Sequence, residues 1–297
     1  MNHYPRTFSD FLQTLFPFKV QKISINAGFT CPNRDGSKGW GGCTYCNNQT
    51  FSPQYEENKK PVGQQLEEGI RFFARKYPQM KYIAYFQAYT GTYDSVENLL
   101  AKYDEALNHP GVVGLIIATR PDCMSGELLD VLEKVARNHF LLIEYGVEST
   151  CNETLLRINR GHTYEEAVDA IRRTAAREIY TGIHLILGLP GESREMILSH
   201  ADRISSLPLT TVKLHQLQLI RNTRMARQAE EHPESFHFYT VDEYIDLCID
   251  FMERLNPDFI IDRFTSQSPQ NLLIAPAWGL KNYEFTAKLM SRLYVKP

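Results

Sequence analysis

Short apolar runs recur along the chain, separated by longer stretches in which apolar residues repeat with a different period. Runs that are rich in Val, Ile, Leu, Tyr and Phe and are bounded by Gly, Pro or polar residues are typical of buried strands. The pattern predicts seven strands, over residues 21–26, 81–88, 112–118, 140–147, 180–187, 211–219 and 258–262.

The stretches between these runs carry apolar residues three and four positions apart, which indicates amphipathic helices. In 125–137, for example, Leu128, Leu129, Leu132 and Val135 share one face. The pattern predicts six helices, over residues 63–75, 95–107, 125–137, 164–177, 194–205 and 241–255.

Strands that alternate with helices indicate βα units and a parallel sheet. We expect an α/β fold, a partial (β/α) barrel of about six parallel βα units with terminal extensions. A barrel commonly uses about 250 residues as one domain, so residues 1–297 are interpreted as a single domain with a core over about 18–280. Reactive side chains should then lie at the carboxyl ends of the strands.

Composition narrows the class of protein. The chain is 43% hydrophobic and 23% charged, which is ordinary for a globular protein and excludes a disordered or collagen-like chain. Its net charge of −3 means that a nucleic-acid partner would need a local basic patch. We expect no membrane span and no signal peptide, and a cytoplasmic location in which the six cysteines stay reduced, metal-bound or catalytic.

Three cysteines lie close together in a Gly-rich segment after the first predicted strand. Cys31 precedes eleven residues, Cys43 follows them, and Cys46 completes a C-x-x-C pair. Three thiolates without a matching fourth favour an iron–sulfur cluster that keeps one iron open. The alternatives are a structural zinc site, completed by His162 or His184, and a redox-active C-x-x-C pair.

The cysteine segment resembles the cluster motif of radical S-adenosylmethionine (SAM) enzymes. Its widened first spacing is similar to that of the Elongator catalytic subunit's radical domain, and aromatic Tyr45 precedes the last cysteine as in the family. The resemblance implies a [4Fe–4S] cluster on Cys31, Cys43 and Cys46, with SAM bound to the open iron.

Later segments resemble the family's SAM-binding motifs in the same order along the chain. The resemblance implies that Gln87 and Thr90 face the amino group of SAM, and that Arg160 pairs with its carboxylate. Strand alternation places Glu144 and Glu148 on one face, either towards SAM or in salt bridges within the barrel. Ile186 and Gly188 are expected to pack against adenine.

The resemblance also implies a reaction. Reductive cleavage of SAM, driven by an external one-electron donor such as flavodoxin or ferredoxin, would give a 5′-deoxyadenosyl radical. The preferred substrate is tRNA, with carboxymethylaminomethyl-uridine trimmed to aminomethyl-uridine at C5 of the wobble base. The alternatives are a radical enzyme acting on a metabolite or peptide, and a non-catalytic iron–sulfur or zinc module.

Further side chains are candidates for contact with the substrate. Lys213 and His215 share one strand face and are candidate catalytic residues. Basic side chains that an RNA backbone needs are expected in three places. These are Arg221, Arg224 and Arg227; Arg172, Arg173 and Arg177; and the segment from Lys281 to Lys296. Trp278, Tyr283 and Phe285 are candidates for base stacking or for the core.

Overall fold

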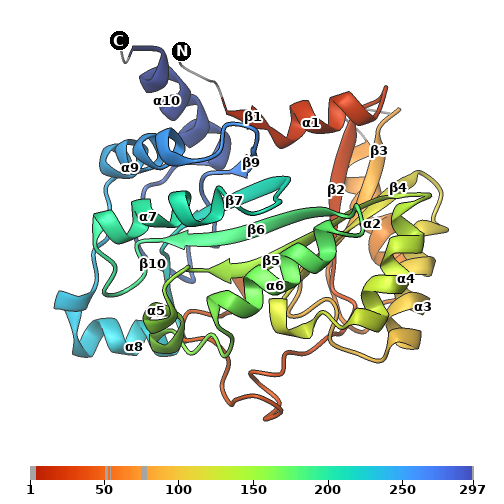
Figure 1. Ribbon diagram of the computed structural model, residues 1–297, viewed down its shortest axis with the longest axis horizontal. Coiled ribbons are helices and arrows are strands. Elements are labelled where there is room, and N and C mark those ends of the chain that lie inside the picture. Colours follow the sequence, from red (N-terminus) through yellow and green to blue (C-terminus); the bar gives the residue numbers. More distant parts are fainter. Residues whose placement is uncertain (1–4, 51–52, 54, 75–78, 296–297) are drawn as a thin grey trace.

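The computed structural model of the protein describes residues 5–50, 53, 55–74 and 79–295. Eight parallel strands form one sheet in the order β1–β9–β7–β6–β5–β4–β3–β2, a half-barrel with helices on its outer side (Figure 1). The partial (β/α) barrel is therefore confirmed. The strands are β1 Arg6–Thr7, β2 Val20–Ile25, β3 Lys81–Phe86, β4 Val112–Thr119, β5 Phe140–Glu148, β6 Tyr180–Leu187, β7 Thr211–Gln216 and β9 Ile260–Arg263.

All seven predicted strands are present, and three of them are shorter than predicted: those over 81–88, 211–219 and 258–262. Residues 211–219 do not form a single strand, because β7 ends at Gln216. The chain then forms β8 (Leu219–Ile220), which pairs antiparallel with β10 (Leu273–Ala275) in a separate two-stranded sheet. This second sheet lies beside the carboxyl ends of the main strands, where it brings residues 266–275 towards β7.

Ten α-helices accompany the strands in the described part of the chain. The six predicted helices correspond to α2, α3, α4, α6, α7 and α9, although the predicted end of the first, Arg75, lies outside the described residues. The sequence pattern did not predict α1, α5, α8 or α10. The helices are α1 Phe8–Leu15, α2 Val62–Ala74, α3 Val96–Leu107, α4 Gly126–Ala136, α5 Asn152–Arg157, α6 Tyr164–Ala175, α7 Arg194–Ile204, α8 Arg224–Glu231, α9 Val241–Arg254 and α10 Asn282–Val295; short 3₁₀ turns cover Asn48–Thr50, Pro121–Cys123 and Pro233–Ser235.

Two apolar layers hold the fold together. On the outer face of the sheet, strand residues such as Leu115 and Ile117 pack against the surrounding helices. On the inner face, Phe11 of α1 joins Ile116 and Leu142 in a second cluster. Helix α1 therefore covers the amino end of the barrel, and the pocket described below lies at the carboxyl ends of the strands.

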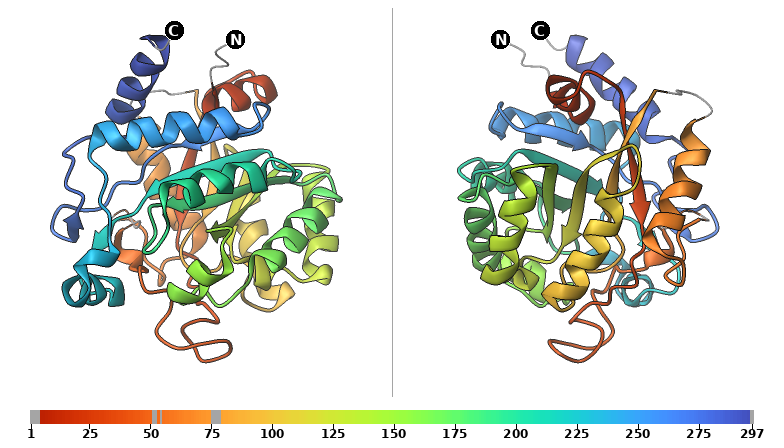
Figure 2. Two further views of the ribbon diagram at one scale, coloured as in Figure 1. Left: turned by 60° about the vertical axis from the view of Figure 1, so that its left-hand side comes forward. Right: turned by 90° about the vertical axis from the view of Figure 1, so that its right-hand side faces the viewer.

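The loop after β2 leaves the body of the protein at that open end. It projects on the side opposite α1 and α10, as the red-orange segment at the bottom of Figure 2 shows. This loop contains the three closely spaced cysteines. Among the described helices, none is both long and apolar enough to cross a membrane.

Glycine at position 114 is required by the close pairing of β4 with β5. A Cβ atom there would lie 2.3 Å from the carbonyl oxygen of Phe140, a backbone atom that cannot move without disturbing β5. We expect Gly114→Ala to lower the free energy of unfolding by about 1–3 kcal/mol, the usual cost of overpacking. The midpoint of urea unfolding measures this loss.

Gly126→Ala is the matched control. Gly126 is the first residue of α4, and a Cβ atom added there meets nothing within 4 Å. Since Ala favours helix over Gly by up to about 1 kcal/mol, this variant should unfold at the same or a slightly higher urea concentration. Equal midpoints for the two variants would contradict the packing argument.

Candidate functional site

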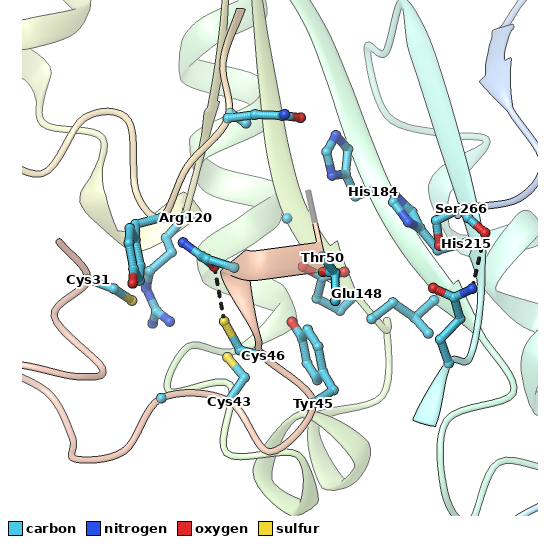
Figure 3. A pocket seen from close by; sticks show the side chains of 18 of the residues that line it. Cys31, Cys43, Tyr45, Cys46, Thr50, Arg120, Glu148, His184, His215 and Ser266 are labelled. Atoms are coloured by element: carbon cyan, nitrogen blue, oxygen red, sulfur yellow. Dashed lines mark hydrogen bonds between the residues drawn. The ribbon is translucent and has the colours of Figure 1, made fainter. Parts of the chain in front are cut away.

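One pocket opens at the carboxyl ends of the strands, between the barrel interior and the cysteine loop (Figure 3). It brings together residues that are more than two hundred positions apart in the sequence. The predicted site residues that line it are Cys31, Cys43, Tyr45, Cys46, Gln87, Thr90, Glu144, Glu148, Arg160, Ile186 and His215. Two others, Gly188 and Lys213, are not part of its lining.

The cysteine loop is held in place by the segment that follows α5. The side chain of Asn33 donates to the carbonyl of Asn159 at 2.5 Å, and the Asn159 amide donates to the carbonyl of Gly42 at 2.8 Å. The backbone amide of Thr44 donates to the carbonyl of Ile158 at 2.9 Å. Gly42 has a φ of 74°, a conformation that glycine adopts without strain. These bonds fix an otherwise irregular loop on both sides of Cys43.

The three thiols face the pocket in different states of burial. Cys43 is buried, whereas Cys31 and Cys46 are half-buried. A bond of 3.1 Å from the Cys46 amide to the Cys43 carbonyl closes the turn that brings these two cysteines together. Burial, together with the neighbouring Cys43, raises the pKa of the Cys46 thiol to about 11. A ligand that needs thiolates must therefore supply positive charge of its own.

The thiols do not converge on one point. Within the described residues, no three His, Cys, Asp or Glu side chains come together tightly enough to enclose a single metal ion. In Figure 3, Cys43 and Cys46 lie below the pocket and Cys31 lies to one side of it. An iron–sulfur cluster differs from a single ion in this respect, because each of its cysteines binds a different iron.

Arg160 lies between the cysteines and the end of β5. Its Nη1 is 3.5 Å from the Cys43 sulfur, and its Nη2 donates to the carbonyl of Gly146 at 2.6 Å. A Cβ atom on Gly146 would lie 2.5 Å from this Nη2, so the approach requires glycine. The Arg160 Nε and the Thr90 hydroxyl are buried and bond to no described residue. Two polar groups beside the thiols are therefore available to a ligand.

Glu148 ends β5 in an unusual backbone conformation. Its φ is 69°, which is uncommon for a residue with a Cβ atom, and the pairing of β5 with β6 shifts register between Gly146 and Glu148. Its carboxylate lies 3.6 Å from Arg160 Nη2. The shared face that strand alternation predicts for Glu144 and Glu148 agrees with their positions, since both line the pocket.

Glu144 forms the centre of a buried charge network at the floor of the pocket. Its Oε2 accepts bonds from Lys213 at 2.6 Å, Tyr85 at 2.8 Å and His184 at 2.8 Å. Burial alone would raise the pKa of the Glu144 carboxyl, but the nearby lysine ammonium groups hold it well below its usual range. Of the two alternatives for Glu144, contact with SAM or a salt bridge within the barrel, its contacts in the structure are those of a salt bridge.

Lys213 lies beneath the pocket rather than at its surface. Besides Glu144, it contacts Asp262 at 2.9 Å, and Asp262 also binds Lys22 at 2.8 Å. Burial would raise the pKa of Asp262, yet the two lysines lower it to about 2. Two cations and two anions therefore balance, and the ionised carboxylates stabilise the fold down to acidic pH.

Several side chains of the site had no role assigned to them from the sequence. Arg120 is 2% exposed, pairs with Asp122 at 2.9 Å and donates to the carbonyl of Arg160 at 2.7 Å. Its position directly after a predicted strand was the available signal. Arg34, whose Nη2 approaches the carbonyl of Cys46 at 3.4 Å, lies inside the cysteine segment itself.

The candidate RNA-binding arginines do not share one helix face. Arg221 precedes α8, so only Arg224 and Arg227 belong to that helix. The guanidinium of Arg224 bonds to the carbonyl of Gly42 in the cysteine loop and is therefore a structural contact. Arg221 and Arg227 are exposed.

The other RNA candidates differ in what they contact. Arg173 and Arg177 bind Asp169 and Asp130, respectively. Lys296 lies outside the described residues. The rings of Trp278 and Phe285 stack at 5.6 Å within the core, so these two aromatics are not free for a base.

The chain is similar to several known proteins. It is 33% identical to the uncharacterized protein YtqA of Bacillus subtilis over 287 residues, 97% of this chain and 88% of YtqA. It is 34% identical over 95 residues to a tRNA uridine(34) acetyltransferase of Methanocaldococcus infernus, 32% of this chain and 17% of that protein. The structure of Elp3 from M. infernus superposes with a TM-score of 0.70 at 17% identity, over 94% of this chain and 64% of Elp3.

Two family descriptions match most of the chain. Residues 28–204 match the Radical SAM superfamily, and residues 209–294 match the Radical_SAM C-terminal domain. The first match contains the cysteine loop and the ends of strands β3–β6, and the second contains β7 and β9. The chain therefore belongs to the radical SAM superfamily, whose enzymes use a [4Fe–4S] cluster and S-adenosylmethionine.

Proposed function

We propose that this radical SAM enzyme acts on tRNA and trims carboxymethylaminomethyl-uridine to aminomethyl-uridine at C5 of the wobble base. The observation that carries the proposal is the fold shared with Elp3 over 94% of this chain. The local similarity to a tRNA uridine(34) acetyltransferase adds support from sequence. The chain spans 64% of the Elp3 structure and 17% of the acetyltransferase, so the proposal takes neither protein's whole activity.

The cluster would be held by Cys31, Cys43 and Cys46, with the fourth iron left for SAM. The donor set fits, because three thiols face one pocket and a guanidinium lies 3.5 Å from one of them. When bound, the cluster and SAM supply a 5′-deoxyadenosyl radical that removes a hydrogen atom from the substrate. Flavodoxin or ferredoxin is the proposed electron donor, and the cytoplasm the proposed location.

Arg160 and Thr90 are the residues best placed for the amino-acid part of SAM. A guanidinium binds a carboxylate through directed, charge-assisted bonds, and the unpaired Nε of Arg160 is one donor for them. The Thr90 hydroxyl, also buried and unpaired, can accept a bond from the amino group. Ile186 and Tyr45 supply apolar surface in the same pocket, and Ile186 is proposed to contact adenine.

The pocket floor keeps water and loose protons away from the radical. Glu144, Lys213 and Tyr85 bind one another, so their polar atoms are directed inwards rather than towards the ligand. Burial and the adjacent Glu144 carboxylate raise the pKa of Tyr85 well above its usual value, so its hydroxyl keeps its proton. The floor is therefore a buried polar surface in which these three side chains bond to one another, while Glu144 Oε1 has no hydrogen-bond partner among the described residues.

RNA would approach the pocket beside the cysteine loop. Arg221 is exposed, and its carbonyl accepts a bond from Asn47, the residue after Cys46, at 3.3 Å. This contact holds one exposed basic residue beside the cysteine loop, next to pocket-lining Ile220. Trp40, in the same loop, is 75% exposed and offers a ring on which a base can stack.

The first test concerns the cluster ligands. Replacing Cys31, Cys43 or Cys46 by Ala should abolish reductive SAM cleavage, because removing one thiolate leaves one iron without a protein ligand. Iron and sulfide content and 5′-deoxyadenosine production, both measured after anaerobic reconstitution, report the result. Cys151→Ala is the matched control, since Cys151 lies outside the pocket and its side chain makes no helix-cap bond. Zinc as the only bound metal in the reconstituted enzyme would overturn the assignment.

The second test concerns the substrate. A strain that lacks the gene should accumulate carboxymethylaminomethyl-uridine in its tRNA and lose aminomethyl-uridine, as measured by nucleoside mass spectrometry. The wild-type gene should restore the pattern, whereas the Cys43→Ala gene should not. Unchanged C5-substituted uridines in a strain without a paralogue would refute the tRNA proposal and favour a metabolite or peptide substrate.

A further inference from the structure

Arg263 enters the pocket because of an irregularity in β9. Ile261 packs in the layer between the sheet and its helices, so strict alternation would direct Asp262 to the interior and Arg263 outwards. The pairing with β7 changes register at this point: Val212 pairs with Ile261, but Lys213 pairs with Arg263. Asp262 therefore has no pairing partner in β7. As a result, Asp262 contacts Lys213 in the barrel interior and Arg263 lines the pocket. Such bulges re-aim side chains next to functional sites.

The guanidinium of Arg263 has no carboxylate partner in the described part of the chain. Its one described side-chain bond is from Nη2 to Nε2 of His215, at 3.4 Å. Its Nε is buried and has no partner. The neighbouring acids Asp262 and Glu144 form their ion pairs with the two lysines of the floor and not with Arg263.

His215 adds no negative charge to compensate. Burial and the neighbouring Arg263 hold the pKa of His215 well below its usual range, so the ring is neutral. Its Nε2 therefore accepts a hydrogen bond from the guanidinium of Arg263. A half-buried cation without a partner is costly, and its cost falls when an anion binds. Arg160, which faces this pocket from the segment that follows α5, differs in this respect, because it lies 3.6 Å from the Glu148 carboxylate.

The surroundings of Arg263 form a rigid polar frame. Gln216 and Ser266 exchange two bonds, from Gln216 Nε2 to the Ser266 carbonyl at 2.9 Å and from the Ser266 amide to Gln216 Oε1 at 2.8 Å. Ser268 donates to Gln218 at 2.7 Å. Figure 3 shows His215 and Ser266 together, on the far side of the pocket from Cys31. The frame thus stands apart from the cysteines that would hold the cluster.

We propose that Arg263, oriented by His215, binds an anionic group of the substrate on the side of the pocket opposite Cys31. The inference deepens the proposed function, on which it rests, because the carboxymethyl group to be removed ends in a carboxylate. A nucleotide phosphate has the same chemistry and is the other possible source of the anion. The carboxylate of SAM is assigned to Arg160, which lies beside Cys43.

Binding of matched RNA hairpins distinguishes the two sources. Anticodon hairpins that carry carboxymethylaminomethyl-uridine, or its carboxamide, are titrated into the reconstituted enzyme. Wild type should prefer the carboxylate by about tenfold to a hundredfold, the worth of a charge-assisted bond. Arg263→Gln should lose this preference and Arg263→Lys should keep part of it, with SAM affinity unchanged in both. An equal loss for both hairpins would assign the site to a phosphate; unchanged binding of both would overturn the proposal.

Arg137→Gln serves as the control for removing a positive charge. Arg137 is exposed and pairs with Glu133 of the same turn, away from the pocket, so this variant should bind both hairpins as wild type does. A loss of preference in Arg137→Gln would show that overall charge, and not Arg263, is responsible.

A second measurement does not depend on RNA. Phenylglyoxal labels accessible arginines, and peptide mass spectrometry of the reconstituted enzyme reports each position. Acetate and phosphate should protect Arg263 severalfold in a saturable way and leave exposed Arg137 unprotected. Protection without any hairpin binding would keep the anion site and refute the tRNA substrate. Two results together would refute the anion site while the tRNA proposal stands: equal turnover of the carboxylate and carboxamide hairpins, and no protection of Arg263 from phenylglyoxal.

Discussion

Buried amides and carbonyls of an irregular loop need hydrogen-bond partners just as those of a helix or strand do. In this protein, that requirement determines how the cysteine loop is held. The loop satisfies part of its amides and carbonyls through its own turns, and other groups find partners elsewhere in the chain. Asn159 and Ile158 supply partners to Gly42 and Thr44 from a segment more than one hundred residues away. The same segment then presents Arg160 to Cys43. The position of the thiols and the position of the proposed SAM-binding guanidinium are therefore set by one contact between two parts of the chain.

Below that contact, the pocket depends on balanced charge. Four ionised groups taken from water would destabilise the barrel if any one lacked a partner. Lys22, Lys213, Glu144 and Asp262 avoid this cost by binding one another across β2, β5, β7 and β9. The network links β2, β5 and β7, which share no backbone bonds with one another in the described sheet, and it reaches β9, the direct neighbour of β7. Arg263 has no carboxylate partner in this network. The two lysines are therefore structural cations, whereas we propose that Arg263 binds a ligand.

The regular strands and helices could be predicted from the sequence, whereas short helices, register shifts and the depth of individual side chains could not. Buried strands and amphipathic helices leave a periodic signal, so the barrel and the pocket-facing positions of Glu144 and Glu148 on β5 could be predicted. Arg160 also faces the pocket, but from the segment after α5 and not from the strand end that the sequence had suggested. Helix α1 was missed because it is only eight residues long, although its apolar face is distinct and packs on the barrel end that it covers. Arg263 was missed because its direction depends on a register shift. Lys213 was named as a candidate catalytic residue because sequence cannot show how deep a side chain lies, and it lies beneath the pocket lining.

The two ends of the sheet meet without joining. In the described chain, β1 and β9 lie at one edge and β2 at the other, and the ion pair of Lys22 with Asp262 links them from 240 positions apart. A closed barrel has a hydrogen-bonded wall all round, but this one has a seam crossed by side chains. Parting the seam breaks no main-chain bond between strands. The wall can therefore yield along a single line when a bulky molecule enters, while the rest of the sheet keeps its pairing.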